Sequence, residues 1–256
     1  MKMNKRILLA GILSFAALFL HAQEDRNKGI IKSALLGLQY EVKAGFSIGG
    51  TAPVPLPVEI RALESYNPTI AIAIEGNATK WFTQKWGMQL GLRLENKSMK
   101  TDARVKNYNL EMIAKDGGQM QGAWTGHVRT KVDNSYLTVP VLATYKLNQR
   151  FRFNAGLFAA YMLEGEFSGS AYDGYLRNGN PTGEKIYVTE ATYDFSDDLR
   201  KFSWGAQLGA EWRAFKHLNV YADFTWGFND IFKKDFDTIT FAMYPIYLNL
   251  GFGYAF

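Results

Sequence analysis

The chain has 256 residues, of which 47% are hydrophobic and 15% aromatic, and its formal net charge is +5. This hydrophobic content excludes an intrinsically disordered chain. The absence of cysteine excludes disulfide bonds. Without cysteine or paired histidines we expect no metal site, and without a Walker-type glycine loop we expect no nucleotide cofactor.

The first 22 residues have the pattern of a secretory signal peptide. An apolar run from Ile7 to Leu20 follows three cations, and Ala22 supplies a small residue before the cut. The run is shorter than the roughly 20 residues that a membrane-spanning helix needs. We therefore expect cleavage after Ala22, followed by a periplasmic lead-in at residues 23–37. Losing the three cations lowers the charge from +5 to +2 (5 − 3), so no nucleic-acid partner is expected.

Eight segments then alternate apolar and polar side chains, as strands with two different faces do. In chain order they are residues 38–48, 68–82, 86–95, 137–147, 151–163, 202–213, 218–229 and 244–256. Tight turns alternate with long connections at residues 51–67, 107–134, 168–200 and 231–243. Bacterial outer-membrane barrels have an even number of strands, short periplasmic turns and longer outer loops. We predict an all-β fold: an eight-stranded antiparallel up-and-down transmembrane β-barrel over residues 38–256.

The last predicted strand, Tyr244 to Phe256, has one apolar face and one small or polar face. A terminal amphipathic strand of this kind closes an outer-membrane barrel. We expect the barrel-assembly machinery to recognise this strand.

The apolar faces carry aromatic residues near the strand ends, as barrels held between two lipid interfaces do. The expected belts are Trp86, Tyr145, Phe153, Trp212 and Phe256 near the short turns, and Tyr161, Trp204, Trp226, Phe228 and Tyr244 near the long connections. A soluble lipocalin-like barrel is the alternative, with its apolar residues inside. The aromatic belts, the regular alternation of short turns with long connections, and the glycine-rich polar faces favour the membrane barrel.

The polar faces carry charges of both signs. The expected lumen charge network is Glu41, Lys43, Glu75, Arg93, Glu95, Arg152, Glu211, Arg213 and Asp223. If Phe82 pairs with Trp86 in the second hairpin, Glu75 lies opposite Arg93. An eight-stranded bore is only wide enough to be filled by its side chains. We therefore predict a closed lumen filled by charge pairs rather than a water channel.

Some small barrels are enzymes with sites at the outer rim, and such a site needs a base, commonly a histidine. His217 lies in a short turn, on the periplasmic side. His127 lies in the second long connection, near Asp116, Lys131, Asp133 and Ser135 in sequence. One loop histidine among common polar residues gives little support to catalysis. We therefore assign no catalytic residue.

The segment Ser135 to Lys146 resembles the proline-containing strand of the PorT-like outer-membrane β-barrel family of Bacteroidota. The segments Phe153 to Tyr161 and Trp204 to Trp212 are similar in residue pattern to strands of that family. The resemblance implies an outer-membrane location and this barrel fold. The namesake of the family is tied to a secretion apparatus, although most relatives have no assigned activity. A long, charged third outer connection departs from the family pattern.

The leading hypothesis is a non-enzymatic barrel in outer-membrane lipid, with a structural or partner-docking role and four outward loops. Residues 107–134 and 168–200 are the expected docking surfaces, because both connections are longer than a simple link requires. The alternatives are a lipid- or peptide-modifying enzyme at the outer rim, a narrow pore, and the soluble carrier. The sequence reveals no ligand.

Overall fold

The computed structural model describes residues 37–69, 71–114, 117–177 and 182–256. The predicted signal peptide and nearly all of the lead-in lie outside these residues. The chain divides into two units, Met1–Gln39 and Tyr40–Phe256, and all of the sheet except the first two residues of β1 belongs to the second. The described part of the chain has one short helix, η1 (Ser196–Asp198), and no helix that is long and apolar enough to cross a membrane.

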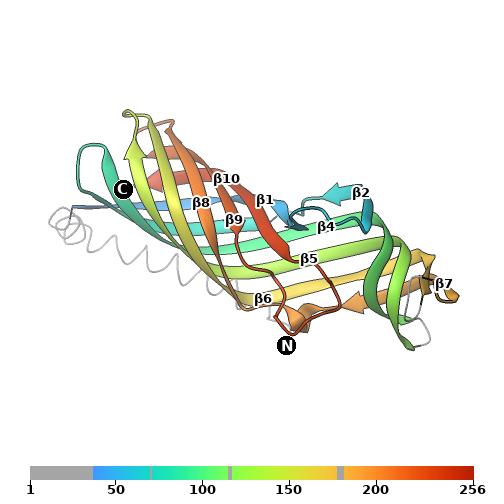
Figure 1. Ribbon diagram of the computed structural model, residues 1–256. Coiled ribbons are helices and arrows are strands. Elements are labelled where there is room, and N and C mark those ends of the chain that lie inside the picture. The colour runs from blue at the N-terminus through green and yellow to red at the C-terminus, as the bar shows by residue number, and fades with distance from the viewer. Residues whose placement is uncertain (1–36, 70, 115–116, 178–181) are drawn as a thin grey trace. The chain divides into compact units, whose positions relative to one another are not determined.

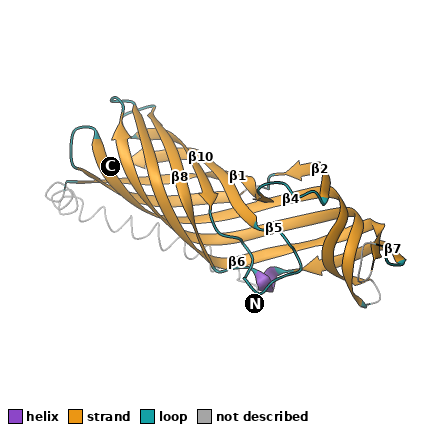
Figure 2. Ribbon diagram, viewed as in Figure 1, coloured by secondary structure: helices purple, strands orange, loops and turns teal. Residues whose placement is uncertain are grey.

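Ten strands form one antiparallel sheet among the described residues (Figures 1 and 2). They are β1 (Leu38–Pro53), β2 (Ile60–Asn67), β3 (Ala71–Trp81), β4 (Trp86–Ala114), β5 (Gln119–Lys146), β6 (Phe151–Arg177), β7 (Lys185–Asp194), β8 (Phe202–Arg213), β9 (Leu218–Gly227) and β10 (Met243–Ala255). Eight of them close a ring in the order β1-β3-β4-β5-β6-β8-β9-β10. Around this ring the strands follow their sequence order, which confirms the predicted eight-stranded up-and-down barrel.

The tight turns set the register of the ring. The Phe82 amide donates to the Trp86 carbonyl across the second hairpin, and Glu75 lies opposite Arg93, as that pairing predicts. β10 pairs with β9 on one side and with β1 on the other, so the final strand closes the ring.

Near the short turns the sheet is apolar on its outside and polar on its inside. In β4, for example, Leu90, Leu92 and Leu94 are exposed, while Gln89 and Arg93 are buried in the bore. All the residues of the two expected aromatic belts are exposed or half-exposed in the structure. We call this part of the barrel the apolar band; it comprises residues 40–52, 71–95, 136–163, 202–228 and 244–256.

The strands are longer than the alternation predicts. We expected residues 107–134 to be a loop, which is wrong: β4 continues to Ala114 and β5 starts at Gln119. Residues 168–200 likewise hold the end of β6 and all of β7, and residues 51–67 include β2. Because these extensions pass beyond the apolar band, we call them, with the β9–β10 loop, the projection; it comprises residues 54–67, 96–114, 117–135, 164–177, 182–200 and 229–242.

The projection has the opposite pattern, with its apolar side chains inside. Its main core residues are Val105, Tyr108, Leu110, Met112, Trp124, Val128, Val132, Phe167, Ala171, Leu176, Ala191, Tyr193, Phe195, Leu199, Ile231, Phe232 and Ile239. β7 pairs with β6 and with the end of β4, so β4, β5, β6 and β7 close a second, smaller ring around part of this core. The β9–β10 loop covers another part, with Phe232 edge-on to Phe167 at 5.0 Å.

Two register shifts change which side chains are buried: one lies where the band meets the projection, and the other lies within the projection. The β5–β6 register shifts between Ser135 and Tyr136, and the β4–β5 register shifts between Val105 and Tyr108. An extra residue in a ladder moves the following side chains to the other face. In β6 the buried side chains therefore change from even-numbered positions, such as Met162, to odd-numbered positions, such as Phe167.

Candidate functional site

The bore of the apolar band gathers charged side chains from strands that are not neighbours in the ring. Lys43 of β1 lies 2.8 Å from Glu211 of β8 and 3.4 Å from Asp223 of β9. Lys43 and Asp223 are fully buried, and Glu211 nearly so. Because β1 and β8 are separated by β9 and β10, the Lys43–Glu211 pair spans the bore.

Arg93 of β4 makes a second crossing of the bore. Its Nε donates to Glu75 on the adjacent strand β3, and its Nη2 donates to Gln207 of β8 at 2.9 Å. Glu95 lies 3.6 Å from the same guanidinium group. A buried guanidinium needs such partners, because an isolated buried charge carries a large desolvation cost.

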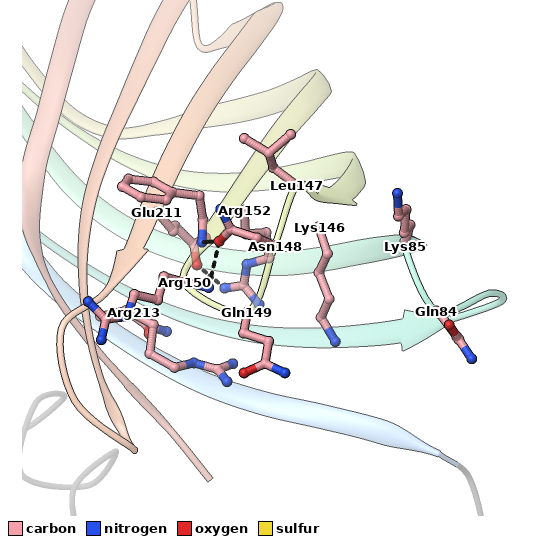
Figure 3. A pocket seen from close by; sticks show the side chains of 12 residues that line it. Gln84, Lys85, Lys146, Leu147, Asn148, Gln149, Arg150, Arg152, Glu211 and Arg213 are labelled. Atoms are coloured by element: carbon pink, nitrogen blue, oxygen red, sulfur yellow. Dashed lines mark hydrogen bonds and ion pairs between the residues drawn. The ribbon is translucent and has the colours of Figure 1, made fainter.

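Arg152 closes the network toward the short turns. Its guanidinium binds both Glu41 of β1 and Glu211 of β8, and Asn154 donates to the other oxygen of Glu211 at 2.7 Å. Figure 3 shows Arg152 joined to Glu211 at this end of the barrel. Arg213, which the sequence places in the same network, is exposed at the mouth and makes no ion pair within the described residues.

Lys97 is a member of the bore that sequence reasoning missed. Its ammonium lies 3.1 Å from Glu95 and within 5.5 Å of the ring centroids of Tyr136, Phe158 and Tyr247. The predicted third strand ended at Glu95, so Lys97 was outside the pattern. The alternation in fact continues past Glu95, because Arg93, Glu95 and Lys97 all occupy odd-numbered positions and are all buried.

His127 has different neighbours from those that its sequence position indicates. A ring nitrogen lies 3.0 Å from Glu64 of β2, and the ring stacks on Tyr172 of β6 at 5.2 Å. The sequence neighbours are engaged elsewhere: Lys131 pairs with Glu166 at 2.6 Å, and Asp133 accepts a hydrogen bond from Ser98. Asp116 lies outside the described residues.

Asp102 of β4 lies beside His127, and one of its carboxylate oxygens accepts two hydrogen bonds. The Arg129 guanidinium donates to it at 3.2 Å, and the Tyr172 hydroxyl donates at 2.7 Å. The hydrogen bond to Asp102 raises the pKa of Tyr172 and also that of Arg129. Arg129 further lies 4.9 Å from the centroid of the Tyr172 ring.

Glu64, Asp102 and His127 bring their ligand atoms within 4.8 Å of one another, a spacing that could hold a metal ion. Local spacing does not indicate this group, because its members come from three separate strands. The surrounding charges oppose a cation, since Arg129 already binds Asp102 and Arg104 lies 3.9 Å from Glu64. The arrangement is therefore better suited to an ion-pair network on the surface of the projection.

A groove of about 780 Å³ lies next to this network on the projection. It is lined by Arg61, Arg104, Val105, Lys106, Thr125, Gly126, His127, Asp173, Gly174, Tyr175 and Tyr187. Three cations and two tyrosines thus face one hollow that contains a single acidic residue. The Lys185 ammonium lies 4.4 Å from the Tyr175 ring centroid and adds positive charge beside the groove.

A family model described as "outer membrane protein beta-barrel domain" matches residues 21–233. No curated protein matches the chain significantly in a sequence search. Among solved structures, the chain is similar to the attachment invasion locus protein Ail of Yersinia pestis at 11% identity and a TM-score of 0.39, covering 86% of this chain and 97% of that one. It is similar to OprG of Pseudomonas aeruginosa at 16% identity and a TM-score of 0.33, covering 85% and 95%. These structural likenesses are weak, whereas the family model covers well over half of the sequence. The chain therefore belongs to the outer membrane protein β-barrel domain family.

Proposed function

We propose that this outer-membrane protein is a non-enzymatic barrel whose closed, charge-filled base holds a rigid docking projection outside the cell. In this proposal a cleaved signal peptide, residues 1–22, directs export, and β10 engages the barrel-assembly machinery. Short turns of bacterial barrels face the periplasm, so the projection, at the opposite end, faces outward. The resemblance to the PorT-like family of Bacteroidota supports a role beside a secretion apparatus.

The observation that carries the proposal is the buried apolar core of the projection. The predicted docking segments 107–134 and 168–200 are largely β-sheet over this core rather than loose connections. A surface held in one conformation loses less conformational entropy when a partner binds. An extension built only to join strands would not need a buried apolar core.

The groove on the projection indicates the chemistry of a partner. Arg61, Arg104 and Lys106 offer positive charge, and Tyr175 and Tyr187 offer flat apolar faces with polar tips. Sulfate or carboxylate groups on a sugar polymer would complement this combination. The proposed partner is therefore an anionic glycan at the cell surface.

The test is binding of dextran sulfate, with neutral dextran as the reference, to full-length protein in lipid nanodiscs. We expect dextran sulfate to bind and the double variant Arg61→Glu, Arg104→Glu to lose at least about tenfold in affinity, because each reversal replaces attraction by repulsion. The matched control is Lys216→Glu with Lys234→Glu, the same charge change away from the groove. Equal binding by the two double variants would exclude the groove as the docking site.

The rival enzyme at the outer rim is favoured by one observation, the pairing of His127 with Glu64. A carboxylate that orients a histidine is a common part of a general-base site. This rival requires a lipid or peptide turnover that His127→Ala abolishes. The rival pore requires a large, stable conductance in planar bilayers that contain the purified protein.

A further inference from the structure

The three short turns carry an unbalanced positive charge. Residues 79–86, 144–152 and 212–219 contain no aspartate or glutamate. Their cations are Lys80, Lys85, Lys146, Arg150, Arg152, Arg213 and Lys216. By contrast, the bore and the projection mix charges of both signs. Fold and pairing alone do not require this asymmetry, because exposed turn positions tolerate either sign.

Five of these cations line one pocket at the mouth of the barrel (Figure 3). The pocket has a volume of about 450 Å³ and is lined by Gln84, Lys85, Lys146, Leu147, Asn148, Gln149, Arg150, Phe151, Arg152, Glu211, Arg213 and Asn219. Its volume lies within the range of roughly 300–1,000 Å³ found for small-ligand sites. The pocket therefore has room for a small anionic group.

Most of the positive charge in the pocket has no internal counterion. Glu211, the acidic residue in the lining, is bound by Arg152 and Lys43. Within the described residues, Lys85, Arg150 and Arg213 form no ion pair, and the Lys146 ammonium lies 3.7 Å from the Trp81 ring centroid instead of against a carboxylate. Like charges gathered in one hollow repel one another, and a bound anion relieves that repulsion.

The position of the pocket along the barrel indicates where the bound anion comes from. Phe82 and Phe215, at the tips of two of these turns, are 67% and 72% exposed, and Phe151 of the pocket lining is also exposed. Aromatic side chains at the ends of barrel strands lie at the membrane–water interface. Phe151 also lines the pocket, so in a membrane the phosphate groups of the adjoining leaflet would lie beside it.

We propose that the mouth pocket binds the phosphate of an anionic phospholipid from the periplasmic leaflet. Arg150, Arg213 and Lys146 contact the phosphate in this proposal, and Asn148 and Gln149 are available to the rest of the headgroup. Guanidinium groups suit this task because their paired donors match the oxygens of a phosphate. The binding is independent of any partner of the projection.

The test uses full-length protein extracted from bilayers with equal amounts of phosphatidylglycerol and phosphatidylcholine. Native mass spectrometry counts the lipids that each variant retains. We expect wild-type protein to retain phosphatidylglycerol preferentially. The double variant Arg150→Gln, Arg213→Gln should lose affinity by roughly thirty-fold, from about 1 kcal/mol per charge. The variant leaves the Arg152–Glu211 pair intact, and unheated gel mobility verifies that it folds.

The matched control is Arg104→Gln with Lys106→Gln, which removes two cations from the projection and should leave lipid retention unchanged. No preference for phosphatidylglycerol in wild-type protein, or an equal loss in both double variants, would overturn the proposal. A separate arm adds inorganic pyrophosphate to protein in phosphatidylcholine alone. Tight binding of pyrophosphate without lipid retention would show that the pocket takes a soluble phosphate instead, which also overturns the lipid assignment.

Discussion

The apolar band and the projection are made from the same strands with opposite patterns. In β4, Leu92 faces outward and Arg93 inward in the band, whereas farther along Arg104 faces outward and Val105 inward. The outside of the band meets lipid, so apolar side chains belong there and charges satisfy one another inside. The outside of the projection meets water, so the hydrophobic effect places its apolar residues inside. The surrounding solvent, rather than the strand, decides which face is apolar.

The largest loss of stability should come from removing a charged side chain from the bore. Arg93→Met leaves Glu75 and Glu95 buried without their guanidinium partner, and loss of one partner of a buried pair costs about 3–5 kcal/mol. We expect a lower urea midpoint for unfolding from lipid vesicles and a weaker mobility shift between unheated and boiled samples. The double variant with Glu75→Gln should recover part of the loss, because it removes one of the unpaired charges. An unchanged midpoint in the single variant would contradict an ion-paired bore.

Removing an apolar side chain from the projection should cause damage of a different kind. Trp124 is fully buried, and replacing such a residue by alanine costs about 3–5 kcal/mol. We expect Trp124→Ala to expose residues 96–135 to added protease while the band remains folded by gel mobility. Trp204→Ala, which alters a residue on the lipid-facing surface, is the control and should leave these cleavage sites protected. Loss of the whole barrel in Trp124→Ala would show that the two regions fold as one unit.

The band was predictable from the sequence, because lipid requires strict alternation there. Residues 86–95 alternate without interruption, and a tight turn sets their register, so the Glu75–Arg93 pairing followed directly. The projection was missed although it also alternates, as Tyr108, Leu110 and Met112 do. Charged and glycine residues surround those positions, and register shifts reverse the parity of the buried positions within β4 after Val105 and within β6 after Met162. An alternation counted from the band therefore does not continue across them.

The candidate site was less predictable than the barrel. The partners of His127 depend on β2 and β6, whose pairing with β4 and β5 places Glu64 and Tyr172 beside the ring. Glu64 lies in a segment with three prolines upstream, which indicates a loop rather than a strand. Long-range pairings of this kind are not encoded in local spacing.

A matched pair of substitutions compares the two outer surfaces directly. Leu208 on β8 and Leu63 on β2 are both 59% exposed, one in the band and one in the projection. Arginine at Leu208 should cost about 2–4 kcal/mol if that position lies near the membrane midplane. Arginine at Leu63 faces water and should change stability by no more than about 0.5 kcal/mol. Urea unfolding from vesicles measures both, and similar costs would mean that the two surfaces meet the same solvent.

The smallest expected effect concerns alkaline pH and the core of the projection. The buried hydroxyl of Tyr193 donates to the Arg129 carbonyl at 3.0 Å, and burial raises the pKa of Tyr193. The unfolded chain loses this proton near pH 10, whereas the folded projection keeps it. The stability of the projection is therefore fully present below about pH 10 and falls as the pH rises above that value.

Tyr193→Phe should cost about 1 kcal/mol at neutral pH through the lost hydrogen bond, and it should make the projection less sensitive to alkali. Ultraviolet absorbance follows phenolate formation, and near-ultraviolet circular dichroism follows the packing of the projection. Tyr187→Phe is the control, because Tyr187 is an exposed side chain of the same region and has no such burial. If Tyr193 ionises near pH 10 while the projection stays packed, its hydroxyl is not held in a dry core. The projection would then contain water, and its contrast with the apolar band would be weaker than its burial indicates.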